Sequence, residues 1–153
     1  MAANGPRMMP DLQASLLCDD VRQERNGKFI VIGIFDVIGV PNFPSVFQRL
    51  CVLNRWCCGM GEFRQRSRIL KADGLTVLVE GKDIPVRLPT AEATATCVEF
   101  FLNVRFESEG EYWVEILLDG DLKLRYPLKA QRIKQPNPPP EPLPSLRSRA
   151  FSP

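Results

Sequence analysis

Histidine is absent from the 153-residue chain. Ser-His-Asp and Cys-His nucleophile arrangements both need an imidazole base, and many metal sites use imidazole ligands. The sequence therefore offers no catalytic constellation and no cofactor site. We expect a protein that is not an enzyme.

Long apolar runs are also missing. No stretch of 18 apolar residues is present, which excludes a membrane-spanning helix of the usual length. The first twenty residues lack a basic region followed by a hydrophobic segment, so they do not resemble a signal peptide. We expect no membrane partner.

Cysteine is sparse and odd in number. The five cysteines include adjacent Cys57 and Cys58, a pattern that suits a reducing compartment better than a disulfide framework. The sequence thus predicts a cytoplasmic protein. Cys18, Cys51 and Cys97 fall within strand-like patterns, where we expect them to act as small core hydrophobes.

Charge of one sign is not in surplus. Residues 11–133 hold 16 Lys and Arg against 17 Asp and Glu, so the formal net charge of +2 arises outside this range. Nucleic-acid-binding proteins usually carry a basic face. We expect no nucleic-acid partner.

What the chain does contain is a strong hairpin pattern. Two alternating apolar runs flank Asp119-Gly120-Asp121, within residues 107–130. A two-residue loop would pair Leu118 with Asp121, whereas a three-residue loop pairs apolar with apolar residues. We favour the longer loop, because register follows the apolar pattern wherever one face is buried. It sets Glu115 opposite Arg125 and gives four apolar pairs: Leu118–Leu122, Ile116–Leu124, Val114–Tyr126 and Tyr112–Leu128.

Further strands are predicted upstream. Residues 29–37 are apolar at both parities, which indicates a central strand covered on both faces, with a bulge or a close backbone approach at Gly33. Residues 40–47 contain two prolines and predict a structured loop. Residues 63–71 are polar and predict a strand near an edge. Other strands are expected at 12–18, 50–57, 75–80 and 93–106.

These elements predict an all-β fold. About eight or nine strands separated by turns, without a helix, are typical of one antiparallel two-sheet β-sandwich of the immunoglobulin-like kind. We expect a flexible N-terminus over residues 1–10 and the sandwich over residues 11–133. Residues 134–153 hold seven of the fourteen prolines and predict a disordered tail, serving either as a polyproline ligand or as a spacer.

Several segments carry a family resemblance. LLCDDV, GKFIVIGIFDVI, VPNFPSVFQRL and GEYWVEILLDGDLKLRYPL resemble a family of uncharacterised bacterial proteins with a "CD…GK…GIFD" opening and a closing hairpin. The likeness covers roughly residues 11–130. It implies a small β-sandwich of unknown function, with no catalytic residues to transfer.

Acidic residues recur near the predicted strand ends: Asp19, Asp20, Asp36, Asp119 and Asp121. Loops that converge at one end of a sandwich can bring carboxylates together around calcium. Aspartate also ends strands and stabilises turns through its own side chain. The five residues are therefore weak metal candidates.

Two features suggest a protein partner. Arg64, Arg66 and Arg68 alternate along one strand and so share one face, which could bind phosphates or an acidic partner. The alternatives are a solvated face paired with carboxylates on a neighbouring strand, or an edge whose charge prevents aggregation. Trp113 lies on the face of its strand opposite to the expected core side, and is either a contact residue or is covered by a second layer or by the end of the core.

Together these patterns predict a non-enzymatic protein-interaction or accessory module. A homodimer through a sheet edge or the Trp113 face is a secondary hypothesis. The alternative is a sandwich that binds a small ligand or calcium through its acidic strand-end loops.

Overall fold

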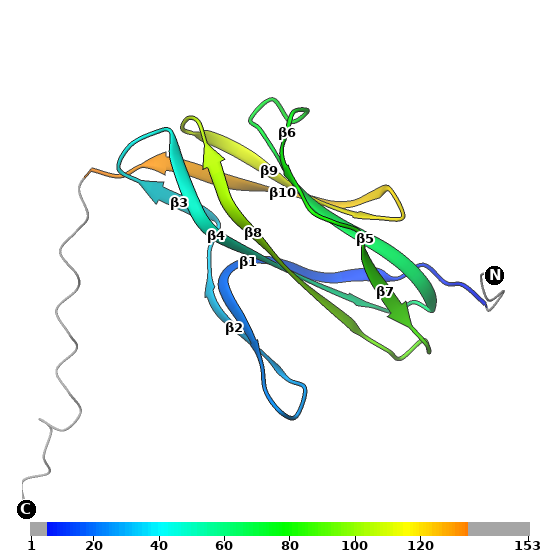
Figure 1. Ribbon diagram of the computed structural model, residues 1–153. Helices are drawn as coiled ribbons and strands as arrows, with labels where there is room; N and C mark the ends of the chain where they lie inside the picture. The colour runs from blue at the N-terminus through cyan, green and yellow to red at the C-terminus, as the bar shows by residue number, and fades with distance from the viewer. Residues whose placement is uncertain (1–5, 135–153) are drawn as a thin grey trace, which may run out of the picture.

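The computed structural model describes residues 6–134, and this part of the chain forms ten strands and no helix (Figure 1). A four-stranded sheet has the order β2-β1-β4-β8, and a six-stranded sheet contains β3-β10-β9-β5-β6, with β7 also paired to β5. The strands are β1 (Asp11–Gln23), β2 (Phe29–Ile34), β3 (Val37–Val40), β4 (Ser45–Cys57), β5 (Gly61–Leu70), β6 (Val77–Glu80), β7 (Ile84–Leu88), β8 (Ala95–Phe106), β9 (Gly110–Leu118) and β10 (Asp121–Arg132).

The core lies between the two sheets, since one buried apolar cluster draws side chains from both of them. Polar contacts also cross the interface from β4 to β5. Trp56 Nε1 donates to Gln65 Oε1 at 2.9 Å, and Asn54 Nδ2 donates to Ser67 Oγ at 2.9 Å. These contacts fix how the sheets face each other, because buried polar groups without bonds are costly. The predicted all-β, two-sheet architecture is confirmed.

The β9–β10 hairpin has a two-residue turn. Asp119 and Gly120 have φ angles of 49° and 83°, both positive as a type I′ turn requires. The predicted three-residue loop was therefore wrong. A register shift between Leu122 and Leu124 leaves Lys123 without a facing residue, and from there on the predicted pairs are confirmed: Leu124–Ile116, Arg125–Glu115, Tyr126–Val114 and Leu128–Tyr112.

The β2 segment is an edge strand, so the prediction of a doubly covered central strand was wrong. Its isoleucines at positions 30, 32 and 34 are exposed. Gly33 lies close to a side chain and not to the backbone that the sequence suggested. Its φ is +68°, and a Cβ there would clash with the Asp19 carboxylate.

The β5 segment lies one strand in from an edge, which agrees with the predicted position near an edge: it pairs with β9 on one side and with the short strands β6 and β7 on the other. Alternate side chains such as Phe63, Gln65 and Ser67 are buried in the interface. The polarity that suggested an edge belongs to the outward arginines. An interior strand can carry charge on a face that no other layer covers.

The predicted loop over residues 40–47 is shorter in the structure. Both of its prolines fall in the bend at residues 41–44, and β4 begins at Ser45. Before the bend, β3 pairs with β10 in parallel, with Ile38 opposite Ala130. The expectation of a wholly antiparallel arrangement was therefore wrong at this edge.

The ends of the described range differ in what they show. Met8 forms an isolated bridge with Met60, and Pro10 is buried, although the sequence predicted a flexible N-terminus over residues 1–10. The predicted proline-rich tail covers residues 134–153, all of which except Lys134 lie outside the described range. Between residues 6 and 134, no helix has the length and hydropathy needed to cross a membrane.

Candidate partner-binding groove

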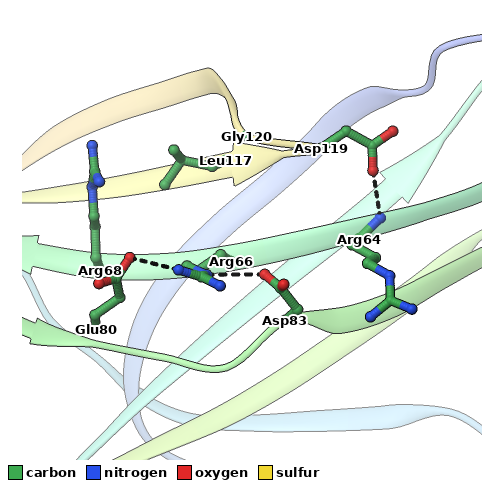
Figure 2. A pocket seen from close by; sticks show the side chains of 8 residues that line it. All are labelled: Arg64, Arg66, Arg68, Glu80, Asp83, Leu117, Asp119 and Gly120. Carbon is green, nitrogen blue, oxygen red and sulfur yellow. Dashed lines mark hydrogen bonds and ion pairs between the residues drawn. The ribbon is translucent and has the colours of Figure 1, made fainter.

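Strand β5 presents its three arginines on the outer face of the six-stranded sheet. Because buried Phe63, Gln65 and Ser67 occupy the inward positions, the residues between them point outward. There they line an open cavity of about 450 Å³, which we call the arginine groove (Figure 2). Its lining residues are Arg64, Arg66, Arg68, Glu80, Asp83, Leu117, Asp119 and Gly120.

Arg66 is held by two carboxylates. Its Nε lies 2.9 Å from Asp83 Oδ1 and its Nη1 lies 3.0 Å from Glu80 Oε1 (Figure 2). The hydrogen bond to Asp83 is the main reason that the pKa of Arg66 is raised, and it lowers the pKa of Asp83 in turn. Both partners therefore stay ionised near neutral pH.

Arg68 is paired with a buried carboxylate. Its Nε donates to Glu115 Oε1 at 2.8 Å, and the Glu115 side chain is only 5% exposed. Arg125 Nη1 lies 3.8 Å from Glu115 Oε2, and the Arg125 guanidinium stacks over the Trp113 ring at 4.8 Å. Trp113 is thus half-buried beneath an arginine, on a different part of the face from the groove.

Arg64 differs from the other two. Within residues 6–134 its guanidinium makes no hydrogen bond or ion pair, although the residue is exposed. Its backbone is fixed to the hairpin turn, since its N–H donates to Asp119 Oδ1 at 2.9 Å and the Asp119 N–H donates to its carbonyl at 2.8 Å. The Asp119 carboxylate also pairs with Arg7, which stacks over the Phe63 ring. The strand is held in place while the Arg64 charge remains available.

The formal charges of the groove sum to zero, since Arg64, Arg66 and Arg68 are balanced by Glu80, Asp83 and Asp119. The hydrogen bonds and ion pairs are distributed unevenly, however. Glu80 and Asp83 both bond to Arg66, Glu115 bonds to Arg68, and Asp119 pairs with Arg7, so Arg64 is attracted to nearby Asp83 without a bonded carboxylate among residues 6–134. A guanidinium can bind a carboxylate or phosphate through two parallel hydrogen bonds. With Leu117 beside it, the groove can accept an anionic group attached to an apolar stem.

The sequence predicted the three arginines on one face but missed their neighbours. Glu80 and Asp83 flank the Gly81-Lys82 turn, and only the pairing of β5 with β6 and β7 brings them to Arg66. Glu115 could have been identified from the sequence as an arginine partner, because its position opposite Arg125 was predicted. The order of the strands beside β5 could not be predicted from the sequence.

The acidic strand-end residues do not converge. Asp20 pairs with Arg49 at 2.9 Å and Arg22 at 3.4 Å, while Asp19 faces Gly33. Asp36 follows β2, and the other two aspartates belong to the β9–β10 hairpin. Across residues 6–134, no three His, Cys, Asp or Glu residues are grouped as metal ligands. No observation in this range favours calcium over a protein partner.

Three of the cysteines lie where the sequence predicted. Cys18, Cys51 and Cys97 are buried. Burial raises the pKa of Cys51 to about 12 and that of Cys97 to about 11. A thiol becomes a nucleophile only as the thiolate, so these residues are unreactive at neutral pH.

Comparison with known proteins gives a family. The family model described as a "Family of unknown function (DUF6941)" matches residues 13–131. The chain belongs to DUF6941. The predicted resemblance to an uncharacterised family is thereby confirmed, and membership of DUF6941 assigns no activity.

Two other comparisons add little to this DUF6941 chain. No curated protein matches it. One similar solved structure is Pseudomonas fluorescens alkylpurine DNA glycosylase AlkC bound to DNA containing an abasic site analog, at 13% identity and a TM-score of 0.42. The match covers 63% of this chain and 28% of the glycosylase chain. A likeness this distant supports no inference about fold or function.

Proposed function

We propose that this protein is a non-enzymatic interaction module whose arginine groove binds an acidic segment of a partner protein. The observation that carries the proposal is the guanidinium of Arg64, which pairs with no carboxylate among residues 6–134 and lies in an open groove, on a strand anchored from both sides. Binding a carboxylate there breaks no ion pair among the described residues.

Arg66 extends the same surface. Its pairs with Glu80 and Asp83 are solvent-exposed, and exposed ion pairs typically stabilise a protein by about 0–1 kcal/mol. An incoming carboxylate can therefore exchange with them at low cost. Arg68 is less available, because leaving the buried Glu115 without its partner would be costly.

An acidic peptide array tests this function. Wild-type protein should bind Asp- and Glu-containing peptides and discriminate against their Asn and Gln counterparts. Arg64→Ala should reduce that binding at least about fivefold, the loss of one charged hydrogen-bonded contact. Arg87→Ala is the matched control, since Arg87 is an exposed arginine on β7 that does not line the groove.

Two outcomes would contradict the proposal. One is wild-type binding that does not distinguish Glu from Gln peptides. The other is an equal loss in the Arg64→Ala and Arg87→Ala variants, which would indicate nonspecific attraction to positive charge.

We also propose that the fold is immunoglobulin-like. Supporting this is Tyr112, near the start of β9, whose hydroxyl donates to the Ser108 carbonyl at 2.8 Å, as in the tyrosine corner of such domains. The pairing of β4 with β8 in one sheet and of β5 with β9 in the other is consistent with it. A solved structure superposed on immunoglobulin domains would test the assignment.

We further propose that the protein is cytoplasmic and of bacterial origin. Five cysteines without a disulfide among the described residues support a reducing compartment. The bacterial source rests on the sequence resemblance. Fractionation of source cells, followed by immunoblotting, tests the compartment.

A further inference from the structure

The edge of the four-stranded sheet is formed by β2, which pairs with β1. The pairs run from Gln23–Phe29 to Cys18–Ile34 and omit Asp19–Gly33, where Gly33 has a positive φ. Beyond them, Phe35 N–H still donates to the Leu17 carbonyl at 3.0 Å. On its other side, no strand among residues 6–134 pairs with β2. Figure 1 shows this hairpin extending beyond the rest of the sheet.

This open edge is apolar. Ile30, Ile32 and Ile34 are 42%, 40% and 61% exposed, and alternate positions share one face of the strand. The six residues of β2, FIVIGI, include no charged residue and no proline. Edge strands usually carry such residues to prevent pairing with other chains, so an edge without them favours association.

We propose that β2 pairs antiparallel with β2 of a second copy of this chain, joining two four-stranded sheets into one continuous sheet. A two-fold interface requires a self-complementary surface. In the register we assign, Ile32 faces Ile32 of the second copy, and Ile30 faces Ile34.

The charges that flank β2 select this register. Lys28 precedes the strand. Asp36 follows it in the bend that leads to β3, where its carbonyl accepts a hydrogen bond from the Lys129 N–H at 3.0 Å. Both residues are exposed, and neither side chain forms an ion pair with residues 6–134. With Ile32 at the two-fold axis, each Lys28 lies opposite Asp36 of the other copy. A shift of two residues would set Lys28 opposite Ile34 or Ile30 opposite Asp36. A shift of one residue would pair the exposed isoleucines with residues that point to the opposite face of the sheet, such as Val31 and Gly33.

The proposed interface is separate from the arginine groove. The groove lies on the outer face of the six-stranded sheet, whereas β2 belongs to the other sheet. Failure of one proposal therefore leaves the other standing.

Size-exclusion chromatography with light scattering tests the dimer, using the full chain from low to high micromolar concentration. Wild-type protein should reach twice the 17.3 kDa chain mass. Ile32→Lys should remain monomeric, because it places two like charges at the two-fold axis. Leu75→Lys is the control and should dimerise like wild type, since Leu75 is 84% exposed and lies in the turn between β5 and β6, outside the proposed interface. Circular dichroism melts verify that each variant is folded.

A charge exchange tests the register. Lys28→Asp or Asp36→Lys alone should raise the dimer dissociation constant about tenfold, and the double variant should recover most of that loss. A wild-type monomer at every concentration, or a dimer that tolerates Ile32→Lys, would overturn the interface. A double variant as weak as the single ones would overturn the register.

Discussion

At the scale of single residues, Glu99 shows how burial between the two sheets changes the pKa of a carboxyl group. It lies on the same side of β8 as Cys97 and Phe101 and accepts a hydrogen bond from the Lys82 N–H at 3.2 Å through Oε2. Its Oε1 is buried without a hydrogen-bond partner among the described residues. Burial raises the pKa of the Glu99 carboxyl for this reason.

The raised pKa predicts a pH dependence of stability. A carboxyl whose pKa is higher in the folded than in the unfolded state stabilises the fold below its unfolded pKa. That contribution disappears as the pH rises through the folded value. Wild-type protein should therefore lose free energy of unfolding relative to Glu99→Gln as the pH rises from 4 to 8. Urea titrations across this range measure it, and parallel pH profiles would contradict the assignment.

Trp56 tests the polar contacts between the sheets. Trp56→Phe keeps an aromatic side chain but removes the donor to Gln65 Oε1, and Gln65 Nε2 already has no hydrogen-bond partner among the described residues. We expect a loss of about 1–3 kcal/mol in the free energy of unfolding, measured in urea. Trp56→Phe with Gln65→Leu should lose less than the sum of the single losses. Additive losses would show that the hydrogen bond does not couple the two residues.

At the scale of elements, turns and close approaches set the strand register. Asp119 and Gly120 accept the positive φ angles of a two-residue turn, and the bulge beyond them restores the apolar pairing of β9 with β10. The apolar pattern correctly predicted the register from Leu124 onward. It gave the wrong loop length, because a bulge produces the same shift as one extra loop residue.

Substitutions at two glycines distinguish the cost of backbone strain from the cost of a steric clash. Gly120→Ala adds a Cβ in open space at φ +83°, so we expect only the strain cost of about 1 kcal/mol. Gly33→Ala adds strain and also a contact with the Asp19 side chain, so it should cost more. In an Asp19→Ala background the cost of Gly33→Ala should fall but stay above that of Gly120→Ala, because the Cβ of residue 19 still lies 3.1 Å from the added Cβ. Urea unfolding measures all of these, and equal costs in the wild-type background would contradict the close approach.

At the scale of the whole molecule, the sequence predicted the two sheets but not which strands form their edges. Residues 29–37 are apolar at both parities, as in a central strand, yet β2 is an edge whose isoleucines are exposed. Residues 63–71 are polar because the outer face of an interior strand carries three arginines. The residues of a strand indicate whether its side chains are buried or exposed. Whether the strand lies at an edge depends on pairing with distant segments of the chain, and only the structure shows this pairing.

The same limit applies to the arginine groove. The alternation of Arg64, Arg66 and Arg68 placed them on one face from sequence alone. Which of them pairs with a carboxylate depends on β6, β7 and β9, which come from distant parts of the chain. Arg64 emerges as the available cation only once those neighbours are in place.

The most direct test of the central claim is calorimetric titration of an acidic peptide chosen from the array against wild type, Arg64→Ala and Arg64→Lys. The account predicts measurable wild-type affinity, loss in Arg64→Ala, and little recovery in Arg64→Lys, because an ammonium does not form the two-bond contact of a guanidinium. Equal affinity in all three proteins would contradict the account and exclude Arg64 as the binding residue.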